Sequence, residues 1–535
     1  MDLFQFKAEQ KKLLIQKVKE RTFDVYAQKN EAQIEQILEE MIYWEKKRIQ
    51  KVERHGQRKR KIQYWENYKQ TYLASSQTER EALLKESIEH YGEQILGNFS
   101  PFVYTLATKA LPHFLTLLLN TLSLKRLVTL RRSNIHENIF LSGHMAWARK
   151  LSQKGTLVFT PTHVSNLDSL VMGIALFYAD LPPVMYGAGL NLFKNKLIGY
   201  FMNNLGAYKV DRLRIHPLYK DVLKEYAACS MELGYHNLYF PGGTRSRSGT
   251  VEKRLKLGLL GTTLKAYVRN LKSQKPNPNI YIIPVNLNSH LTLEAETLID
   301  DFLAASGQSR YIIENDEFSK PKRVLDYLWN MMKLDSKVFV HFGEPLDPFG
   351  NRVDEEGVSR DAHGRVIDIS RYVKKDGVVD VEEDRDQNYT KELGAVLLDV
   401  FHRNNRVLST NLVAFTLYEM IAKRYPDFDI YKLLRTHTYG EPISLVHLYE
   451  RLDKVRALVQ QLAIQQRIID EDVVAKDSQD IVNEALKIFG SYHNRKTVYR
   501  VGDQIHVGDL LLLYYYHNRL VGYNLEDMMW GGANG

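Results

Sequence analysis

The sequence predicts an α/β protein with mainly helical regions at both of its ends. Short apolar runs with the character of buried strands occur at 155–160, 238–240 and 282–285, and helical patterns separate them. Residues 1–95 contain no proline and have a helical pattern, and helical periodicity dominates again from 391 to about 490. Strands that alternate with helices are typical of a domain built around a sheet.

These patterns divide the 535 residues into five regions. In chain order they are a basic helical region at 1–95, a helical segment suited to a membrane surface at 96–135, an α/β domain at 136–345, a linker or insertion with short hairpins at 346–390, and a mainly helical region at 391–535. A chain of this length exceeds one ordinary domain and can bury a large core. We find no internal repeat in it.

The strand at 155–160 leads into a segment with two titratable side chains. Pro161 ends the strand, His163 follows in a loop, and Asp168 precedes an apolar run at 169–176 that is typical of a buried helix. A spacing of five residues lets the chain fold back so that the carboxylate accepts one imidazole N–H, which leaves the other ring nitrogen as a base. The alternative is that Asp168 only caps the helix and His163 is a surface residue.

A second cluster follows the strand end at 238–240. It reads Phe240-Pro241-Gly242-Gly243-Thr244-Arg245-Ser246-Arg247-Ser248-Gly249. Its glycines permit a positive φ or a close backbone approach, and two guanidiniums beside backbone N–H groups suit a dianion such as phosphate. A solvated basic turn is the alternative. Together the two segments predict a site that activates the hydroxyl of a phosphorylated substrate.

Four blocks of the chain resemble, in order and spacing, the glycerolipid acyltransferase family and within it the glycerol-3-phosphate acyltransferase branch. The blocks are 163–168, which has the family's His-x4-Asp form, 206–212, 240–249 and 282–285. Weaker similarity at 405–408 and 513–520 favours the long bacterial enzymes of that branch. One departure lies in the third block, where this chain has Gly242 and the family usually has glutamate.

The resemblance implies a mixed central sheet flanked by helices, with the catalytic residues in the domain at 136–345. It also implies that His163 takes the proton from a glycerol hydroxyl while Asp168 holds the imidazole, as that oxygen attacks the thioester of acyl-CoA or acyl carrier protein. The residues implied for the substrate phosphate are Arg245, Ser246, Arg247, Gly243, Thr244, Arg212 and Lys209. Arg212 and Lys209 could equally be solvated surface charges.

The sequence gives no sign of a metal or redox cofactor. It has no Cys/His cluster with metal-ligand spacing and no dinucleotide glycine pattern, so we expect none, and the acyl thioester is a co-substrate. The single cysteine, Cys229, excludes a disulfide scaffold and suggests a reducing compartment. It lies outside the four blocks, and we interpret it as structural.

Charge and hydropathy favour a membrane surface. The net charge of +9, from 73 Lys and Arg against 64 Asp and Glu, favours anionic partners. Nine basic residues and one acidic residue lie between positions 46 and 61; a solvated helix face or nucleic-acid binding could explain them, but we expect an anionic bilayer. The apolar stretch at 101–124 is too interrupted to span a membrane, so it is a buried core helix or an interfacial segment, and a lipid product favours the second.

We therefore expect a protein on the cytoplasmic face of a membrane, peripheral or interfacially inserted. A signal peptide is not expected, because Met1 leads into a stretch rich in Lys, Glu and Gln. Two other functions stay open: acylation of 1-acylglycerol-3-phosphate, whose acceptor also has a phosphate and a hydroxyl, and a non-catalytic lipid- or partner-binding role, which Gly242 permits. No nucleic-acid partner is expected, because the chain has no recognisable recognition module for one.

Overall fold

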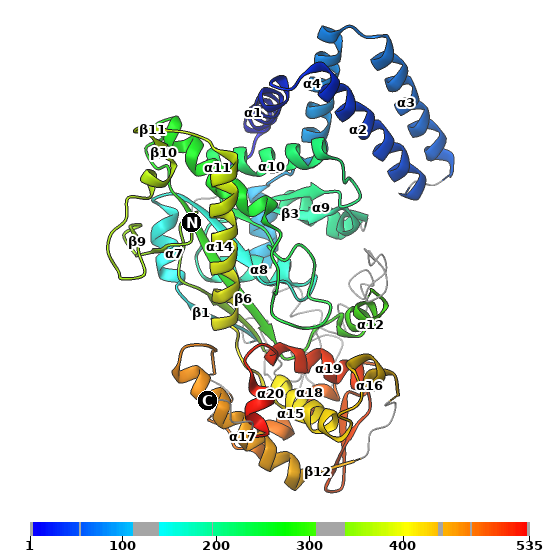
Figure 1. Ribbon diagram of the computed structural model, residues 1–535, viewed down its shortest axis with the longest axis vertical. Coiled ribbons are helices and arrows are strands. Elements are labelled where there is room, and N and C mark those ends of the chain that lie inside the picture. The colour runs from blue at the N-terminus through cyan, green and yellow to red at the C-terminus, as the bar shows by residue number, and fades with distance from the viewer. Residues whose placement is uncertain are drawn as a thin grey trace.

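A seven-stranded mixed sheet forms the centre of the protein (Figure 1). The computed structural model describes residues 4–52, 55–110, 138–194, 196–305, 337–436, 442–470, 473 and 475–531. The strands of the central sheet are β1 (Ile139–Gly143), β2 (Thr156–Pro161), β3 (Met185–Gly189), β4 (Ala207–Val210), β5 (Asn237–Leu238), β6 (Ile280–Ser289) and β7 (Val338–Phe342). Their order across the sheet is β1-β7-β6-β2-β5-β3-β4.

The sheet is parallel from β6 to β4, and its other edge runs in the opposite direction. β2 pairs in parallel with β5 and β6, whereas β6 and β7 are antiparallel and β1 is parallel to β7. β2 is buried at every position, because helices cover both faces of the sheet. The α/β fold with a mixed central sheet, predicted from the sequence, is confirmed.

Alternate residues of the central strands enter two different cores, as expected for a strand buried on both faces. Leu157 and Phe159 of β2 pack on one face against α7 and α8, and Val158 packs on the other face against α11 and α14. The helices around the sheet are α7 (Met145–Ser152), α8 (Asp168–Tyr178), α9 (Lys196–Asn204), α10 (Pro217–Glu232), α11 (Leu257–Lys272), α12 (Ala295–Ala305) and α14 (Glu383–Arg403), with a 3-10 turn, η3 (Leu190–Lys194).

Four long helices form the N-terminal region. They are α1 (Ala8–Ala27), α2 (Glu31–Val52), α3 (His55–Ala74) and α4 (Gln77–Ile95). α1 packs against α4 and α10, while α2 and α3 form a hairpin that extends from the body of the molecule (Figure 1). Aromatic side chains of this region, such as Tyr26 and Tyr91, share one buried cluster with Tyr226 of α10. The N-terminal helices therefore pack onto the sheet domain through a common core.

The C-terminal region is also helical, as predicted, and it surrounds one buried helix. That helix, α15 (Ser409–Arg424), is buried on almost all sides from Ser409 to Ile421 and packs against α17, α18 and α19. The remaining elements are α16 (Ile430–Thr436), β12 (Ile443–Ser444), α17 (Leu445–Ile464), α18 (Ser478–Phe489), β13 (Val498–Val501), β14 (Gln504–Val507), α19 (Leu510–His517), η6 (Asn518–Leu520) and α20 (Leu525–Met529). Figure 1 shows this region at the end of the sheet toward which the arrow of β6 points.

Three similar turns follow β7, so the interpretation that the chain has no internal repeat is wrong. The turns begin at Asp347, Asp354 and Asp361, and each has a glycine of positive φ three residues later. In each turn the Asp Oδ1 accepts the backbone N–H groups two and four residues further on. The short elements of this segment are β8 (Arg352–Val353), β9 (Ser359–Arg360), η5 (Ile369–Val373), β10 (Lys374–Lys375) and β11 (Val378–Val379).

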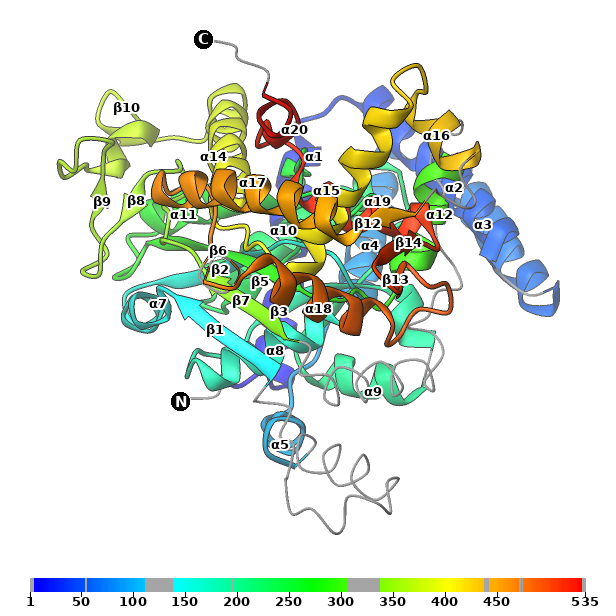
Figure 2. The same cartoon turned by 90° about the horizontal axis from the view of Figure 1, so that it is seen from below.

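The segment predicted to associate with a membrane is described only in part. Residues 101–110 form α5 (Pro101–Thr105) and a π-helical turn, η1 (Leu106–Ala110), at the periphery of the molecule (Figure 2). Positions 111–135 lie outside the described residues. Among the helices that the structure describes, none combines the length and apolar character needed to cross a bilayer.

Candidate active site

Two loops meet at the carboxyl ends of adjacent parallel strands. His163 lies two residues after the end of β2, and Phe240 lies two residues after the end of β5. Because β2 and β5 are neighbours, both loops leave the sheet at the same edge, where open α/β sheets place their ligands. The His163 and Phe240 rings stack with centroids 4.1 Å apart, and the Ser246 N–H donates to the His163 carbonyl at 2.8 Å.

The structure brings His163 and Asp168 together as the spacing predicts. Imidazole Nδ1 lies 2.9 Å from Asp168 Oδ2, and the same oxygen accepts the backbone N–H groups of Val164 and Ser165 at 2.7 and 2.8 Å. Asp168 is the first residue of α8, but these bonds tie it to the loop before the helix. A carboxylate at Nδ1 favours the tautomer with its proton on that nitrogen, so Nε2 carries the lone pair.

The electrostatic surroundings favour the neutral form of the His163 imidazole. Burial lowers the pKa of His163 below its usual value of 6.5; the Asp168 hydrogen bond and charge oppose this, and the positive charges of Arg245 and Arg212 lower the pKa further. A general base must be unprotonated before it can accept a proton. The direction of this shift therefore suits a base, and it shows that Arg245 and Arg212 lie close enough to act on His163.

A buried glutamate that the sequence analysis missed joins the two loops. Glu294 is fully buried immediately before α12, and its carboxylate accepts the Ser165 hydroxyl at 2.7 Å and the Asn166 N–H at 3.1 Å. Arg245 Nη1 lies 3.3 Å from Glu294 Oε1. Glu294 thus contacts both the loop of His163 and the first arginine of the second cluster.

The second cluster forms a tight loop that requires glycine at one point. Gly243 has a φ of +72°, donates its N–H to the Phe240 carbonyl at 2.9 Å and packs against the side chain of Lys256. The Ser246 hydroxyl donates to the Thr250 carbonyl at 2.8 Å, so this side chain holds the loop closed. Thr244 is exposed at the loop surface.

The other predicted cations lie around this loop. The charges of Arg247 and Arg245 both act on the carboxyl of Asp301 in α12, whose pKa burial raises and these two arginines lower. Arg212 lies in the loop after β4. Lys209 lies on β4 itself, opposite Ala188 of β3. Arg245 and Arg212 therefore lie close enough to act on His163, Arg247 shares Asp301 with Arg245, and Lys209 lies on the edge strand.

The loop that carries Arg212 is held by the N-terminal helices. Arg48 of α2 contacts Asp211 at 2.5 Å, and Glu45 contacts Arg214 at 2.6 Å. Burial raises the pKa of Glu45, but a hydrogen bond from His216 and the charges of Arg214 and Arg48 lower it to about 2. This buried network joins the N-terminal region to the candidate active site, and no local pattern in the sequence indicates it.

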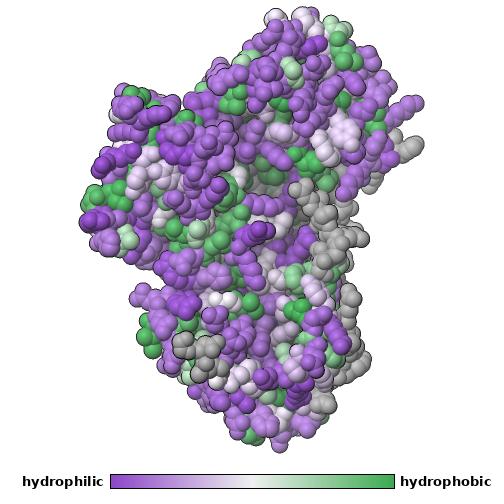
Figure 3. Space-filling view, viewed as in Figure 1, coloured by the Kyte–Doolittle hydropathy of each residue, from purple (hydrophilic) through white to green (hydrophobic). Residues whose placement is uncertain are grey.

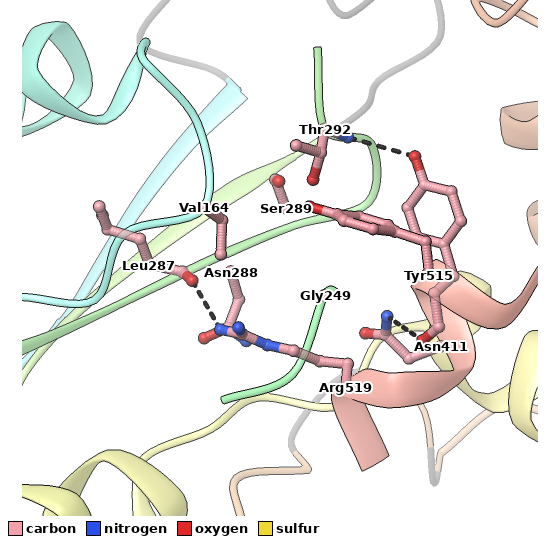
Figure 4. A pocket seen from close by; sticks show the side chains of 10 residues that line it. Val164, Gly249, Leu287, Asn288, Ser289, Thr292, Asn411, Tyr515 and Arg519 are labelled. Carbon is pink, nitrogen blue, oxygen red and sulfur yellow. Dashed lines mark hydrogen bonds between the residues drawn. The ribbon is translucent and has the colours of Figure 1, made fainter. Parts of the chain in front are cut away.

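The C-terminal region covers the other side of the site (Figure 4). Asn518 donates to the Ser248 carbonyl at 2.8 Å, and Arg519 Nη2 donates to the Leu287 carbonyl at 2.9 Å. Gly249 lies against the carbonyl of Tyr515, where a larger residue would not fit. Gly249, Tyr515 and Arg519 are among the residues that line a small cavity of about 20 Å³ beside the loop, roughly the volume needed for one water.

Two further findings concern metal ligands and the single cysteine. Among the residues that the structure describes, no group of three or more His, Cys, Asp or Glu side chains is arranged to hold a metal ion. Cys229 is fully buried in α10, and burial raises the pKa of its thiol to about 12. A thiol in this state is a poor nucleophile, which agrees with the interpretation of Cys229 as structural.

The region that contains this site is similar to known acyltransferases. Residues 145–288 match the family model described as Acyltransferase, and this range contains both loops. A protein of Pseudomonas fluorescens named glycerol-3-phosphate acyltransferase is 28% identical over 204 residues, which are 38% of this chain and 22% of the relative. A protein of the same name from Pseudomonas syringae pv. tomato is 27% identical over 215 residues, or 40% of this chain and 24% of the relative. The match thus spans less than a quarter of the length of these curated relatives.

Proposed function

We propose that this chain transfers a fatty acyl group from an acyl thioester to a hydroxyl of glycerol-3-phosphate. Support comes from the match of residues 145–288 to the Acyltransferase family model and from the similarity of part of the chain to proteins named glycerol-3-phosphate acyltransferase. The observation that carries the proposal is the pairing of His163 Nδ1 with Asp168 Oδ2 at 2.9 Å, with Arg245 and Arg212 near enough to lower the pKa of the same imidazole. The site therefore combines a base with cations. A substrate that uses both must have a hydroxyl group for the base and an anionic group for the cations.

In the proposed reaction, His163 Nε2 accepts the proton of the glycerol hydroxyl as its oxygen attacks the thioester carbon. The tetrahedral intermediate collapses with loss of the thiolate, which takes the proton from the imidazolium and leaves as a thiol. Asp168 keeps the ring oriented and stabilises its transient charge. General base catalysis contributes about 10²–10⁴-fold, so positioning of the hydroxyl and stabilisation of the oxyanion must supply the rest.

The acceptor phosphate is assigned to the second cluster and the arginine after β4. Arg245, Arg247 and Arg212 supply charge, the backbone of Gly243 and Thr244 supplies N–H donors, and Ser246 and Lys209 complete the predicted set. Two guanidiniums that lower the pKa of one imidazole also raise the local affinity for a dianion. The substrate would therefore present its phosphate to the arginines and its hydroxyl to His163.

The deciding experiment is an acylation assay with the purified full chain. Labelled acyl-CoA or acyl carrier protein would be offered with glycerol-3-phosphate or with 1-acylglycerol-3-phosphate in separate reactions. Label transferred to glycerol-3-phosphate supports the proposal. Transfer only to the acylated acceptor would move the activity to the next acylation step, and no transfer to either would favour a lipid- or partner-binding role.

We also propose that the protein works on the cytoplasmic face of a membrane. Phe102 of α5 is 75% exposed, and Leu106 of η1 and Tyr200 of α9 are 42% and 55% exposed on neighbouring elements. By contrast, the face shown in Figure 3 is mostly hydrophilic, with apolar side chains in small scattered groups. Exposed aromatic and leucine side chains of this kind insert into the boundary between headgroups and acyl chains.

Vesicle binding by the full chain tests this second proposal. Phe102→Ser with Leu106→Ser should reduce binding to anionic vesicles, whereas Val446→Ser with Ile464→Ser, a pair of exposed apolar residues on α17, should not. Neutralising the exposed Lys59, Arg60 and Lys61 should weaken binding and its dependence on salt. If neither the Phe102 and Leu106 substitutions nor the loss of the three basic residues changed vesicle binding, the membrane contact would lie elsewhere in the protein. RNA or DNA binding lost with the same lysines and arginine would favour a nucleic-acid partner.

A further inference from the structure

A second buried glutamate contacts the loop of His163. The Glu252 side chain is 8% exposed, and its Oε1 accepts the backbone N–H of His163 itself at 2.7 Å. The two residues are 89 positions apart in the sequence, so this bond ties the end of the second cluster to the loop after β2. An N–H buried at this position needs an acceptor, because a buried donor without one costs about 1–3 kcal/mol.

The side chain of Glu252 fills the space in front of Gly242. A Cβ built on Gly242 would stand 3.3 Å from Glu252 Cγ and 3.6 Å from its Oε1. Position 242 therefore faces the carboxylate that holds His163, and a larger side chain there would compete with it. Gly242 is also the position at which the chain departs from the family that it resembles, where glutamate is usual.

Glu252 has a second carboxylate oxygen that does not bind His163, and the charge of a buried arginine, Arg519, acts on this carboxyl group. Within the described part of the chain, Oε2 has no hydrogen-bond partner, and neither has Nη1 of Arg519, whose side chain is 6% exposed in the cavity of Figure 4. Burial raises the pKa of Glu252, while the His163 N–H and the Arg519 charge lower it. The C-terminal region thus supplies the positive charge that accompanies this carboxylate.

We propose that Glu252 is a positioning residue of the acyltransferase site: from position 252 it delivers the carboxylate for which Gly242 leaves room, and it fixes the peptide unit of His163. The inference rests on the proposed acyltransferase function. The proposal also explains how the third block can have a glycine at position 242 and still keep a carboxylate beside His163. The side chain of Glu252, ten residues further along the chain, fills the space next to Gly242.

Single variants at 252 test the role of the carboxylate. Glu252→Ala should lower kcat about tenfold or more while the KM values for donor and acceptor change less than about twofold, because the base is misplaced and the substrate contacts remain. Glu252→Gln keeps an oxygen for the His163 N–H and should retain more activity than alanine. Glu252→Asp, which is too short to reach, should resemble alanine. Normal kcat in the alanine variant would overturn the proposal.

An exchange of the two positions is the sharper test. Gly242→Glu should reduce activity, because its side chain meets Glu252 and buries a second carboxylate beside the first. In Gly242→Glu/Glu252→Gly the carboxylate returns to the same space from the other side, so the double variant should be at least about fivefold more active than either single variant. Such non-additivity is expected only of residues that share one site. A double variant no better than the worse single variant would contradict the inference.

Amide hydrogen exchange of the peptide that contains residues 162–166 gives a readout without turnover. Exchange should be faster in Glu252→Ala and near normal in Glu252→Gln and in the exchanged double variant. A wild-type protein that transfers no acyl group would overturn the proposed function and, with it, the catalytic meaning of Glu252. Normal wild-type activity with unchanged exchange in Glu252→Ala would overturn only the positioning role.

Discussion

Arg245 Nη1 and Glu294 Oε1 lie 3.3 Å apart, and the same carboxylate accepts hydrogen bonds from Ser165 and Asn166. One buried side chain therefore supports both the proposed phosphate ligand and the loop of the proposed base. A phosphate bound to Arg245 would weaken the attraction between Arg245 and Glu294. Because Glu294 also accepts hydrogen bonds from Ser165 and Asn166, this change would reach the loop that follows His163. The two halves of the site are connected inside the protein and not only through the substrate.

The first prediction concerns the base. His163→Ala should lower kcat by at least about 10²-fold with little change in the melting temperature, because the side chain that accepts the proton is lost. His363→Ala, which removes an exposed imidazole from the turns after β7, is the matched control and should be fully active. Near-normal turnover in His163→Ala would show that His163 is not the general base.

The second prediction concerns pH. The base is active when neutral, and burial followed by the charges of Arg245 and Arg212 lowers the pKa of His163, so the acid limb of kcat/KM should lie below pH 6.5. Asp168→Asn removes the interactions that raise this pKa and should move the limb to lower pH while kcat falls. Arg212→Gln removes a charge that lowers it and should move the limb to higher pH. Two shifts in the same direction would contradict this electrostatic account.

The sequence could predict the parts of this structure that depend on short-range patterns. The strand predicted at 155–160 is β2, which runs from Thr156 to Pro161, and the five-residue spacing of His163 and Asp168 does bring their side chains together. The turns after β7 also have a local sequence signal, since from Asp347 an Asp with a glycine three residues later recurs every seven residues, at Asp354 and Asp361.

Other parts of the site could not be found in this way, because their partners are far apart in the chain. Glu252 and Glu294 reach the loop of His163 across 89 and 128 residues, and Arg48 reaches Asp211 across 163. An isolated acid or base on a polar background has no pattern that distinguishes it from a solvated charge. Only the packing of the strand ends and of the N-terminal helices brings these charges to the site.

The third prediction separates the two roles of Arg245. Arg245→Ala should raise the acceptor KM, because a phosphate ligand is lost, and should lower stability by about 1–3 kcal/mol, because it leaves Glu294 buried without its cation. Arg245→Lys should recover part of the KM effect, since it keeps charge but not the forked geometry.

Adding Glu294→Gln to Arg245→Ala should restore much of the melting temperature and none of the acceptor affinity. Arg254→Ala, an exposed arginine just beyond the loop, serves as the control for loss of charge. A donor KM that rises while the acceptor KM stays normal would instead assign Arg245 to the anionic acyl donor.

The last prediction concerns the N-terminal helices, which contact the site without entering it. Arg48→Ala would leave Asp211, next to Arg212, and the fully buried Glu45 with less positive charge around them. The melting temperature should fall, and the acceptor KM should rise, because the loop that carries Arg212 loses one of its two charged contacts with α2. Lys59→Ala, which removes an exposed charge from α3, should change neither quantity. A lower melting temperature with an unchanged acceptor KM would mean that α2 stabilises the fold but does not position Arg212.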